Sequence, residues 1–146
     1  MKFKKVIDFL VRMINLSLDS CPNTTQESAT KTSLISPNHP NHYPNQQDCT
    51  WKLTSPQSHF IEMEIEHFEV GYNCNDYVEI IDELAISRPK KLLKFCGTNV
   101  PPKLLTSTGH EVIIRFNSRG PSGFKGFKIN YKSVNRGEIK HLLEIV

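Results

Sequence analysis

The 146-residue sequence has no run of about 18 or more apolar residues, so no segment of it is predicted to span a bilayer. It also lacks the Gly-x-Ser-x-Gly, His-Glu-x-x-His and glycine-rich phosphate-binding patterns of common hydrolases, zinc proteases and nucleotide-binding enzymes. No block of one charge sign is present, because 18 basic residues are mixed with 15 acidic ones to give a net charge of +3. These absences argue against an enzyme and against a nucleic-acid-binding protein.

Four cysteines are present, and no two of them have the Cys-x-x-Cys spacing of many zinc sites: Cys21, Cys49, Cys74 and Cys96. An even count without that spacing favours two disulfides, although the sequence alone leaves all three pairings open. Disulfides require an oxidising compartment and leave no free thiol as a nucleophile. The cysteines therefore favour extracellular binding over cytosolic catalysis. The chain length is sufficient for one domain with a hydrophobic core.

From Asp48 onward, apolar residues recur at every second position. In the segment from Phe60 to His67, Ile61, Met63 and Ile65 share one face and three glutamates share the other. Several short alternating strands separated by turn residues predict an all-β fold, an antiparallel sandwich or barrel. Each strand has one apolar face, so two sheets must pack together to cover these faces. The predicted inward residues are Trp51, Leu53, Ile61, Met63, Ile65, Val78, Ile80, Val112, Ile114, Phe116, Phe127, Ile129 and Tyr131.

Outside the alternating region the sequence is less regular. Residues 1–20 read as an N-terminal extension or a poor signal peptide, because a basic start is followed by an apolar segment that charged and polar residues interrupt. Residues 22–47 have loop composition, with one short strand expected at Ser33–Ile35. Residues 135–146 read as a C-terminal tail or linker with helical apolar spacing.

Five segments together resemble the CUB domain, an extracellular β-sandwich module. They are Ser36-Pro-Asn-His-Pro-Asn-His-Tyr-Pro-Asn45, Asp48-Cys-Thr-Trp51, Asn73-Cys-Asn-Asp-Tyr-Val-Glu-Ile80, Phe95-Cys-Gly97 and Gly126-Phe-Lys-Ile-Asn-Tyr131. Each segment is weakly specific alone, but all five occur in the family's order together with the four cysteines. The resemblance covers residues 21–134 and implies a jelly-roll-like antiparallel sandwich. It also implies the disulfides Cys21–Cys49 and Cys74–Cys96, each contributing roughly 3–4 kcal/mol by the chain-entropy model.

The resemblance also indicates which residues occupy the family's calcium-binding positions. Many CUB domains hold one Ca²⁺ at one end of the sandwich through a glutamate before the third cysteine, an aspartate after it and an aspartate in a later loop. Glu69 and Asp76 match the first two positions, but the third is Arg119. Arginine removes an anionic ligand and adds a cation, so the resemblance implies a degenerate calcium site, and we expect no cofactor.

Arg119 is open to three interpretations. Our hypothesis is that its guanidinium occupies the ion position and pairs with Glu69 or Asp76, which its planar fork suits. Alternatively, Arg119 points into solvent, or calcium is retained through Asn117, Ser118 or main-chain oxygens. In calcium-bearing relatives the ligand acids also hold a lysine of the partner, so this chain is expected to bind its partner in another way. Glu69, Asp76 and Arg119 are the candidate binding residues.

The resemblance implies an extracellular, non-catalytic protein-interaction module that belongs to, or derives from, a larger secreted or membrane-bound protein. Two alternatives are a carbohydrate- or glycosaminoglycan-binding CUB domain and an accessory CUB domain of a metalloprotease. The row of Glu62, Glu64 and Glu66 and the lysines near the last strand read mainly as solvated strand faces. Asn23, in Asn23-Thr-Thr25, is a candidate N-glycosylation site, and we expect Phe124 to pack under the sheet.

Overall fold

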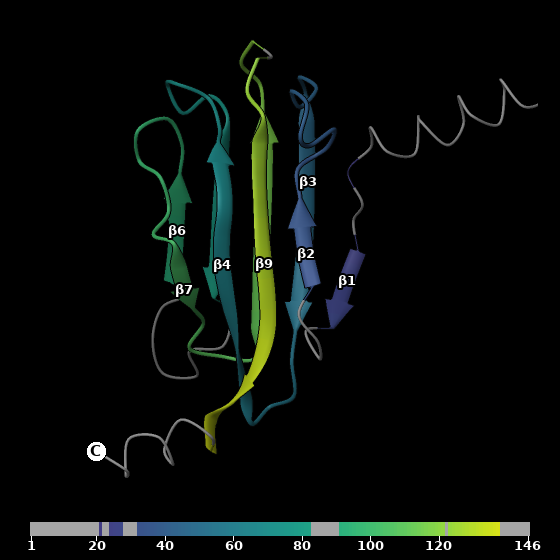
Figure 1. Ribbon diagram of the computed structural model, residues 1–146, viewed down its shortest axis with the longest axis vertical. Helices are drawn as coiled ribbons and strands as arrows, with labels where there is room; N and C mark the ends of the chain where they lie inside the picture. Colours follow the sequence, from purple (N-terminus) through teal and green to yellow (C-terminus); the bar gives the residue numbers. More distant parts are fainter. Residues whose placement is uncertain (1–20, 22–23, 28–31, 83–90, 122, 138–146) are drawn as a thin grey trace, which may run out of the picture.

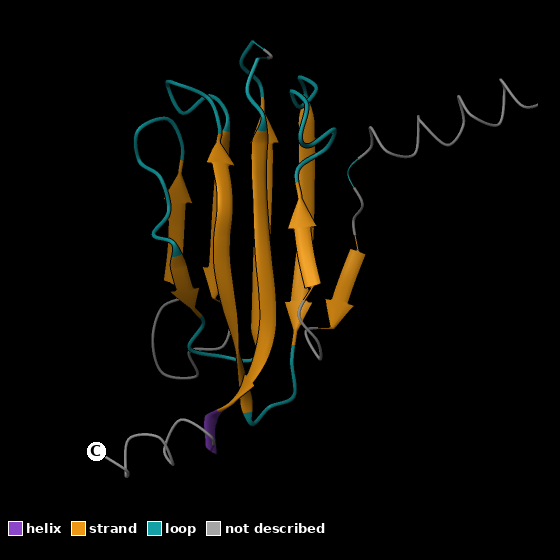
Figure 2. Ribbon diagram, in the orientation of Figure 1, coloured by secondary structure: helices purple, strands orange, loops and turns teal. Residues whose placement is uncertain are grey.

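The computed structural model describes residues 21, 24–27, 32–82, 91–121 and 123–137, in which nine strands form two facing sheets (Figures 1 and 2). The predicted N-terminal extension and the region from Glu138 onward lie outside these residues. The strands are β1 (Thr24–Glu27), β2 (Thr32–Ile35), β3 (Gln47–Thr54), β4 (His59–Glu69), β5 (Tyr77–Asp82), β6 (Lys91–Phe95), β7 (Leu104–Thr106), β8 (Glu111–Ser118) and β9 (Gly126–Asn135).

One sheet has the order β1-β3-β8-β5-β6 and the other the order β2-β9-β4-β7. All neighbouring strands pair antiparallel except β1, which pairs parallel with β3. The predicted all-β sandwich is thus confirmed, and β2 coincides with the strand expected at Ser33–Ile35. β1 was not predicted, because its four polar residues lie in a segment of loop composition. Within the described residues, no helix has the length and apolar character needed to cross a membrane.

The core lies between the sheets and consists of the inward side chains that the alternation predicts. Trp51, Phe116 and Phe127 are 0–1% exposed and meet edge to face, with ring centroids 5.9 Å apart for Trp51 and Phe127 and 5.4 Å apart for Phe116 and Phe127. Large buried rings in such pairs contribute more than their buried area alone. The core therefore fixes which face of each strand is available to a ligand.

The outer face of the four-stranded sheet carries alternating acidic and basic side chains. The register places Glu62 directly opposite Lys132, and the two form an ion pair at 2.9 Å. Lys128 pairs with Glu66, also at 2.9 Å. Glutamates of β4 and lysines of β9 thus neutralise each other, which argues against reading either row as an independent recognition strip.

The two disulfides join Cys21 to Cys49 and Cys74 to Cys96, over sequence separations of 28 and 22 residues. This is the pairing that the resemblance implied. The first bond ties the start of the described chain to β3. The second ties the loop after β4 to the end of β6, at the edge where the candidate binding residues lie.

Candidate binding site at one end of the sandwich

Loops from both sheets gather at one end of the sandwich, uppermost in Figure 1. We call this set the loop end; it comprises residues 36–46, 70–76, 96–103, 119–121 and 123–125. Because β2, β4, β6 and β8 finish at this end and β3, β5, β7 and β9 start there, residues far apart in the sequence become neighbours. All three candidate binding residues lie on or beside these loops.

Asp76 lies at the centre of the loop end and is fully buried. Its Oδ1 accepts hydrogen bonds from the main-chain N–H groups of Arg119 and Gly120, both at 2.6 Å. Its Oδ2 accepts a hydrogen bond from the Tyr43 hydroxyl at 2.7 Å. A buried carboxylate is costly unless donors satisfy it, and here three donors from two other loops do so.

Tyr43 also contacts the start of the loop that carries Asp76. Its hydroxyl also accepts a hydrogen bond from the N–H of Gly71 at 3.2 Å. Burial raises the pKa of Tyr43 well above its usual value. The hydrogen bond to Asp76 raises this pKa further, and so do the negative charges of Asp76 and Glu69. The phenol therefore stays protonated and can donate to Asp76 at any physiological pH.

Glycines allow the loops to approach one another this closely. A Cβ atom at Gly120 would lie 3.1 Å from Asp76 Oδ1. Gly97 has a φ of +55°, and its Cβ would lie only 2.4 Å from the carbonyl oxygen of Tyr72. Its N–H also donates to the Val70 carbonyl at 2.8 Å. The loop after β6 is therefore pressed against the loop after β4, next to the Cys74–Cys96 bond.

Tyr72 lies on the outside of this rigid group, with 85% of the residue exposed. Its ring meets Phe124 edge to face, with centroids 4.7 Å apart. Phe124 is 9% exposed and packs against the core cluster, as the sequence analysis expected. The loop end therefore presents a large aromatic side chain on a fixed base.

Arg119 lies at the loop end, but its side chain does not make the expected ion pair. Its main-chain N–H, and not its guanidinium, contacts Asp76. Glu69 instead lies 3.9 Å from His67 Nε2. Within the described part of the chain no carboxylate pairs with the guanidinium, which is exposed beside Asp48 and Asn117. The ion-pair hypothesis for Arg119 is thus not supported, because Asp76 already has three donors of its own.

The same geometry tests the fit to calcium. Both oxygens of Asp76 accept hydrogen bonds from protein groups, and the third expected position is a cation. Among the described residues, no group of three His, Cys, Asp or Glu side chains could hold a metal ion. Ca²⁺ requires several oxygen ligands, so the residues present do not fit it.

Two further points concern individual residues. Asn23, the candidate glycosylation site, lies outside the described residues. Sequence reasoning missed Tyr43 as the hydrogen-bond partner of Asp76. The tyrosine belongs to the motif that begins at Ser36, but nothing in that motif shows that its hydroxyl reaches a carboxylate 33 residues away.

Comparison with known proteins agrees with this architecture. The sequence model of the CUB domain matches residues 21–131. Human cubilin is 37% identical over 106 residues, which cover 70% of this chain and 3% of cubilin. The chain thus spans a small part of the length of such relatives.

Two solved structures are similar to it. The full extracellular region of zebrafish Gpr126/Adgrg6 superposes with a TM-score of 0.68 at 30% identity, over 80% of this chain and 15% of that one. The MASP-1 CUB2 domain bound to Ca²⁺ superposes with a TM-score of 0.62 at 20% identity, over 77% of this chain and 98% of that one. The second likeness concerns the fold alone.

Proposed function

The chain belongs to the CUB domain family, and from this premise we propose that it is an extracellular, non-catalytic module that binds another protein through its loop end. Relatives that support this proposal include cubilin, tolloid-like protein 1 and the extracellular region of an adhesion receptor. In these relatives the matching segment is a small part of a longer chain, so the module acts as one unit of a larger secreted or membrane-bound protein.

The observation that carries the proposal is the exposed ring of Tyr72. It stands on the loop end, which is held in place by the hydrogen bonds of Asp76 and by the Cys74–Cys96 disulfide. Tyrosine is enriched among the residues that dominate binding energy at protein interfaces. Because the loops are already ordered, little conformational entropy is lost when a partner binds. Glu69, whose side chain is 43% exposed, adds an acidic group at the same end.

The chemistry of the loop end supports binding over catalysis. All four cysteines are in disulfides, so none is available as a nucleophile. Asp76 is buried with both oxygens engaged, and Tyr43 remains protonated. Both groups are buried out of reach of a substrate, so the network serves to position the loops.

The proposed loop end is organised by the chain's own donors and not by calcium. The N–H groups of Arg119 and Gly120 and the hydroxyl of Tyr43 occupy the oxygens of Asp76 that would otherwise face an ion. Partner binding is therefore expected to be independent of calcium. The MASP-1 domain that is similar in fold was solved with Ca²⁺, so the two domains would differ in this respect.

Site-specific photo-crosslinking tests the proposal. The chain, produced by secretion with its disulfides formed, carries the crosslinker either at Tyr72 or at Gln57, an exposed turn residue at the opposite end. We expect a saturable crosslink to an extracellular protein from position 72 only, in EDTA as well as in calcium. Tyr72→Ala should weaken that binding roughly tenfold or more, while loss of the contact with Phe124 lowers unfolding stability by only about 1 kcal/mol. Equal crosslinking from both positions, or binding that survives Tyr72→Ala, would refute the proposed surface.

A further inference from the structure

Exposed apolar side chains gather along one edge of the molecule. Four large hydrophobic residues of the described chain are exposed, and three of them lead from the loop end to β7: Tyr72, Val100 and Leu104. We call these three residues the edge strip. Tyr72 touches the loop that carries Val100, because a Cβ atom at Gly97 would lie 2.4 Å from the Tyr72 carbonyl oxygen. Leu104 is the first residue of β7, toward the left of Figure 1.

β7 is an edge strand, and within the described residues it pairs with β4 only. The N–H of Ile65 donates to the Lys103 carbonyl at 2.8 Å, and the N–H of Ser107 donates to a carbonyl of β4 at 2.9 Å. Main-chain groups alternate in direction along an antiparallel strand, so Leu104 and Thr106 turn theirs away from β4. Two N–H groups and two carbonyl groups therefore face outward, with no partner in the described part of the chain.

An extended segment of another protein is the ligand that suits such an edge. Its own N–H and carbonyl groups continue the ladder, and its side chains lie beside those of the edge strand. β7 has only three residues, so hydrogen bonds alone would hold the segment weakly. Leu104 and Val100, both more than half exposed, supply apolar contacts beside the same edge.

Lys103 adds a preference for charge. It is exposed directly before β7, and it forms no ion pair within the described ranges. Three lysines on the sheet faces, in contrast, each pair with a glutamate at 2.9–3.2 Å: Lys52, Lys128 and Lys132. Residues 96–107 contain no acidic residue. An incoming segment that carries a carboxylate is therefore favoured over a basic one.

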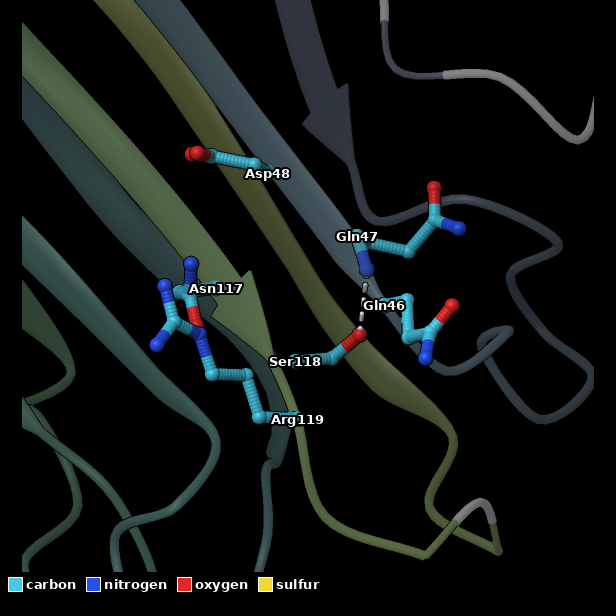
Figure 3. Close-up of a pocket in the computed structure, with 6 residues that line it drawn as sticks. All are labelled: Gln46, Gln47, Asp48, Asn117, Ser118 and Arg119. Carbon is cyan, nitrogen blue, oxygen red and sulfur yellow. Dashed lines mark hydrogen bonds between the residues drawn. The ribbon is translucent and has the colours of Figure 1, made fainter.

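The part of the loop end over β3 and β8 has a different character. Six polar or charged residues line a hollow there, among them Asp48, Asn117 and Arg119 (Figure 3). This hollow offers no apolar side chain to a partner. The apolar surface therefore continues from Tyr72 toward β7 and not toward β8.

We propose that an extended segment of the partner adds to the free side of β7, packs apolar side chains on Leu104 and Val100, and offers a carboxylate to Lys103. This inference rests on the proposed function, since the same partner contacts Tyr72. Successive side chains of a strand point to opposite faces, and Lys103 and Leu104 are adjacent in the sequence. The segment is therefore one in which apolar and acidic residues alternate.

A model peptide tests the edge. The probe is a seven-residue peptide of alternating valine and glutamate, titrated into ¹⁵N-labelled chain and followed by NMR. We expect the amide signals of Leu104 and Thr106 to shift, and their hydrogen exchange to slow at least about threefold at saturation. The same peptide with every main-chain nitrogen methylated should not bind, because it has no N–H donors. A valine–lysine peptide should bind about fivefold more weakly.

The other edge of the same sheet provides the control. Ile35 on β2 is also exposed, but no other exposed large hydrophobic residue of the described chain accompanies it there. Leu104→Asp should weaken peptide binding at least about tenfold, and Ile35→Asp should leave it unchanged. The proposal fails if the amides of Leu104 and Thr106 do not respond, or if the methylated peptide binds equally well. It also fails if both aspartate variants weaken binding to the same degree.

A photo-crosslinker at position 104, with position 35 as its control, separates this inference from the proposed function. Strand addition predicts that position 104 captures the same protein as position 72 and that position 35 does not. Capture from position 72 without capture from position 104 would refute strand addition and leave the loop-end surface standing. Capture from position 104 alone would support the edge and refute the role of Tyr72.

Discussion

Removing the hydroxyl of Tyr43 is the sharpest single perturbation of the loop end. Tyr43→Phe deletes the 2.7 Å bond to Asp76 and leaves the Gly71 N–H, 3.2 Å away, without its acceptor. A hydrogen bond to a charged group contributes about 1.5–3 kcal/mol, and an unsatisfied buried donor costs about 1–3 kcal/mol. Because the Gly71 contact is long, we expect a loss of about 2–4 kcal/mol in the free energy of unfolding. That corresponds to a fall in melting temperature on the order of 10 °C.

Urea denaturation of wild type, Tyr43→Phe and Tyr72→Phe measures this effect. Tyr72→Phe removes a hydroxyl from an exposed tyrosine at the same end, so it should change stability by no more than about 0.5 kcal/mol. A double-mutant cycle with Asp76→Asn should show coupling of at least about 1 kcal/mol. If Tyr43→Phe behaves like Tyr72→Phe, or the cycle shows no coupling, Asp76 is not held in the way described here.

Three further predictions concern the same end of the molecule. The double substitution Cys74→Ser/Cys96→Ser should cost roughly 3 kcal/mol of unfolding free energy in chemical denaturation, since it opens a loop with a separation of 22 residues. Gly97→Ala should lower the free energy of unfolding by about 1–3 kcal/mol, measured in thermal melts. An L-residue is strained at a φ of +55°, and its Cβ would meet the Tyr72 carbonyl. Gly137→Ala should cost less, because Gly137 does not have a positive φ and its Cβ would meet only Asn135 Oδ1, at 3.4 Å. Burial raises the pKa values of Tyr43 and Tyr131 above the ordinary tyrosine value of about 10, so their stabilising effect is complete below about pH 10 and is lost as the pH rises further. Stability above pH 10 should therefore fall less steeply in Tyr43→Phe than in wild type, and equal slopes would contradict this.

Much of the fold follows from local pattern. The alternation in β4 places Ile61, Met63 and Ile65 in the core because a strand turns every second side chain to the same face. β1 has no such pattern, since its residues Thr24–Glu27 are all polar and form a strand only by pairing with β3. That pairing is a tertiary interaction, which local composition does not encode.

The candidate site was predictable only in part. Family motifs pointed to Asp76 and Arg119, but the donors on Asp76 include two main-chain N–H groups, which every residue other than proline carries. Sequence therefore gives no sign of them. The direction of the Arg119 side chain depends on how β8 continues into its loop.

Calcium dependence tests most directly whether the loop end is held by the chain's own donors. Calorimetric titration with Ca²⁺, together with thermal melts in calcium and in EDTA, should show no binding tighter than about a millimolar and no change in melting temperature. A dissociation constant below that range, with a melting temperature that rises with calcium concentration, would show that an ion and not Tyr43 and the two main-chain N–H groups satisfies Asp76.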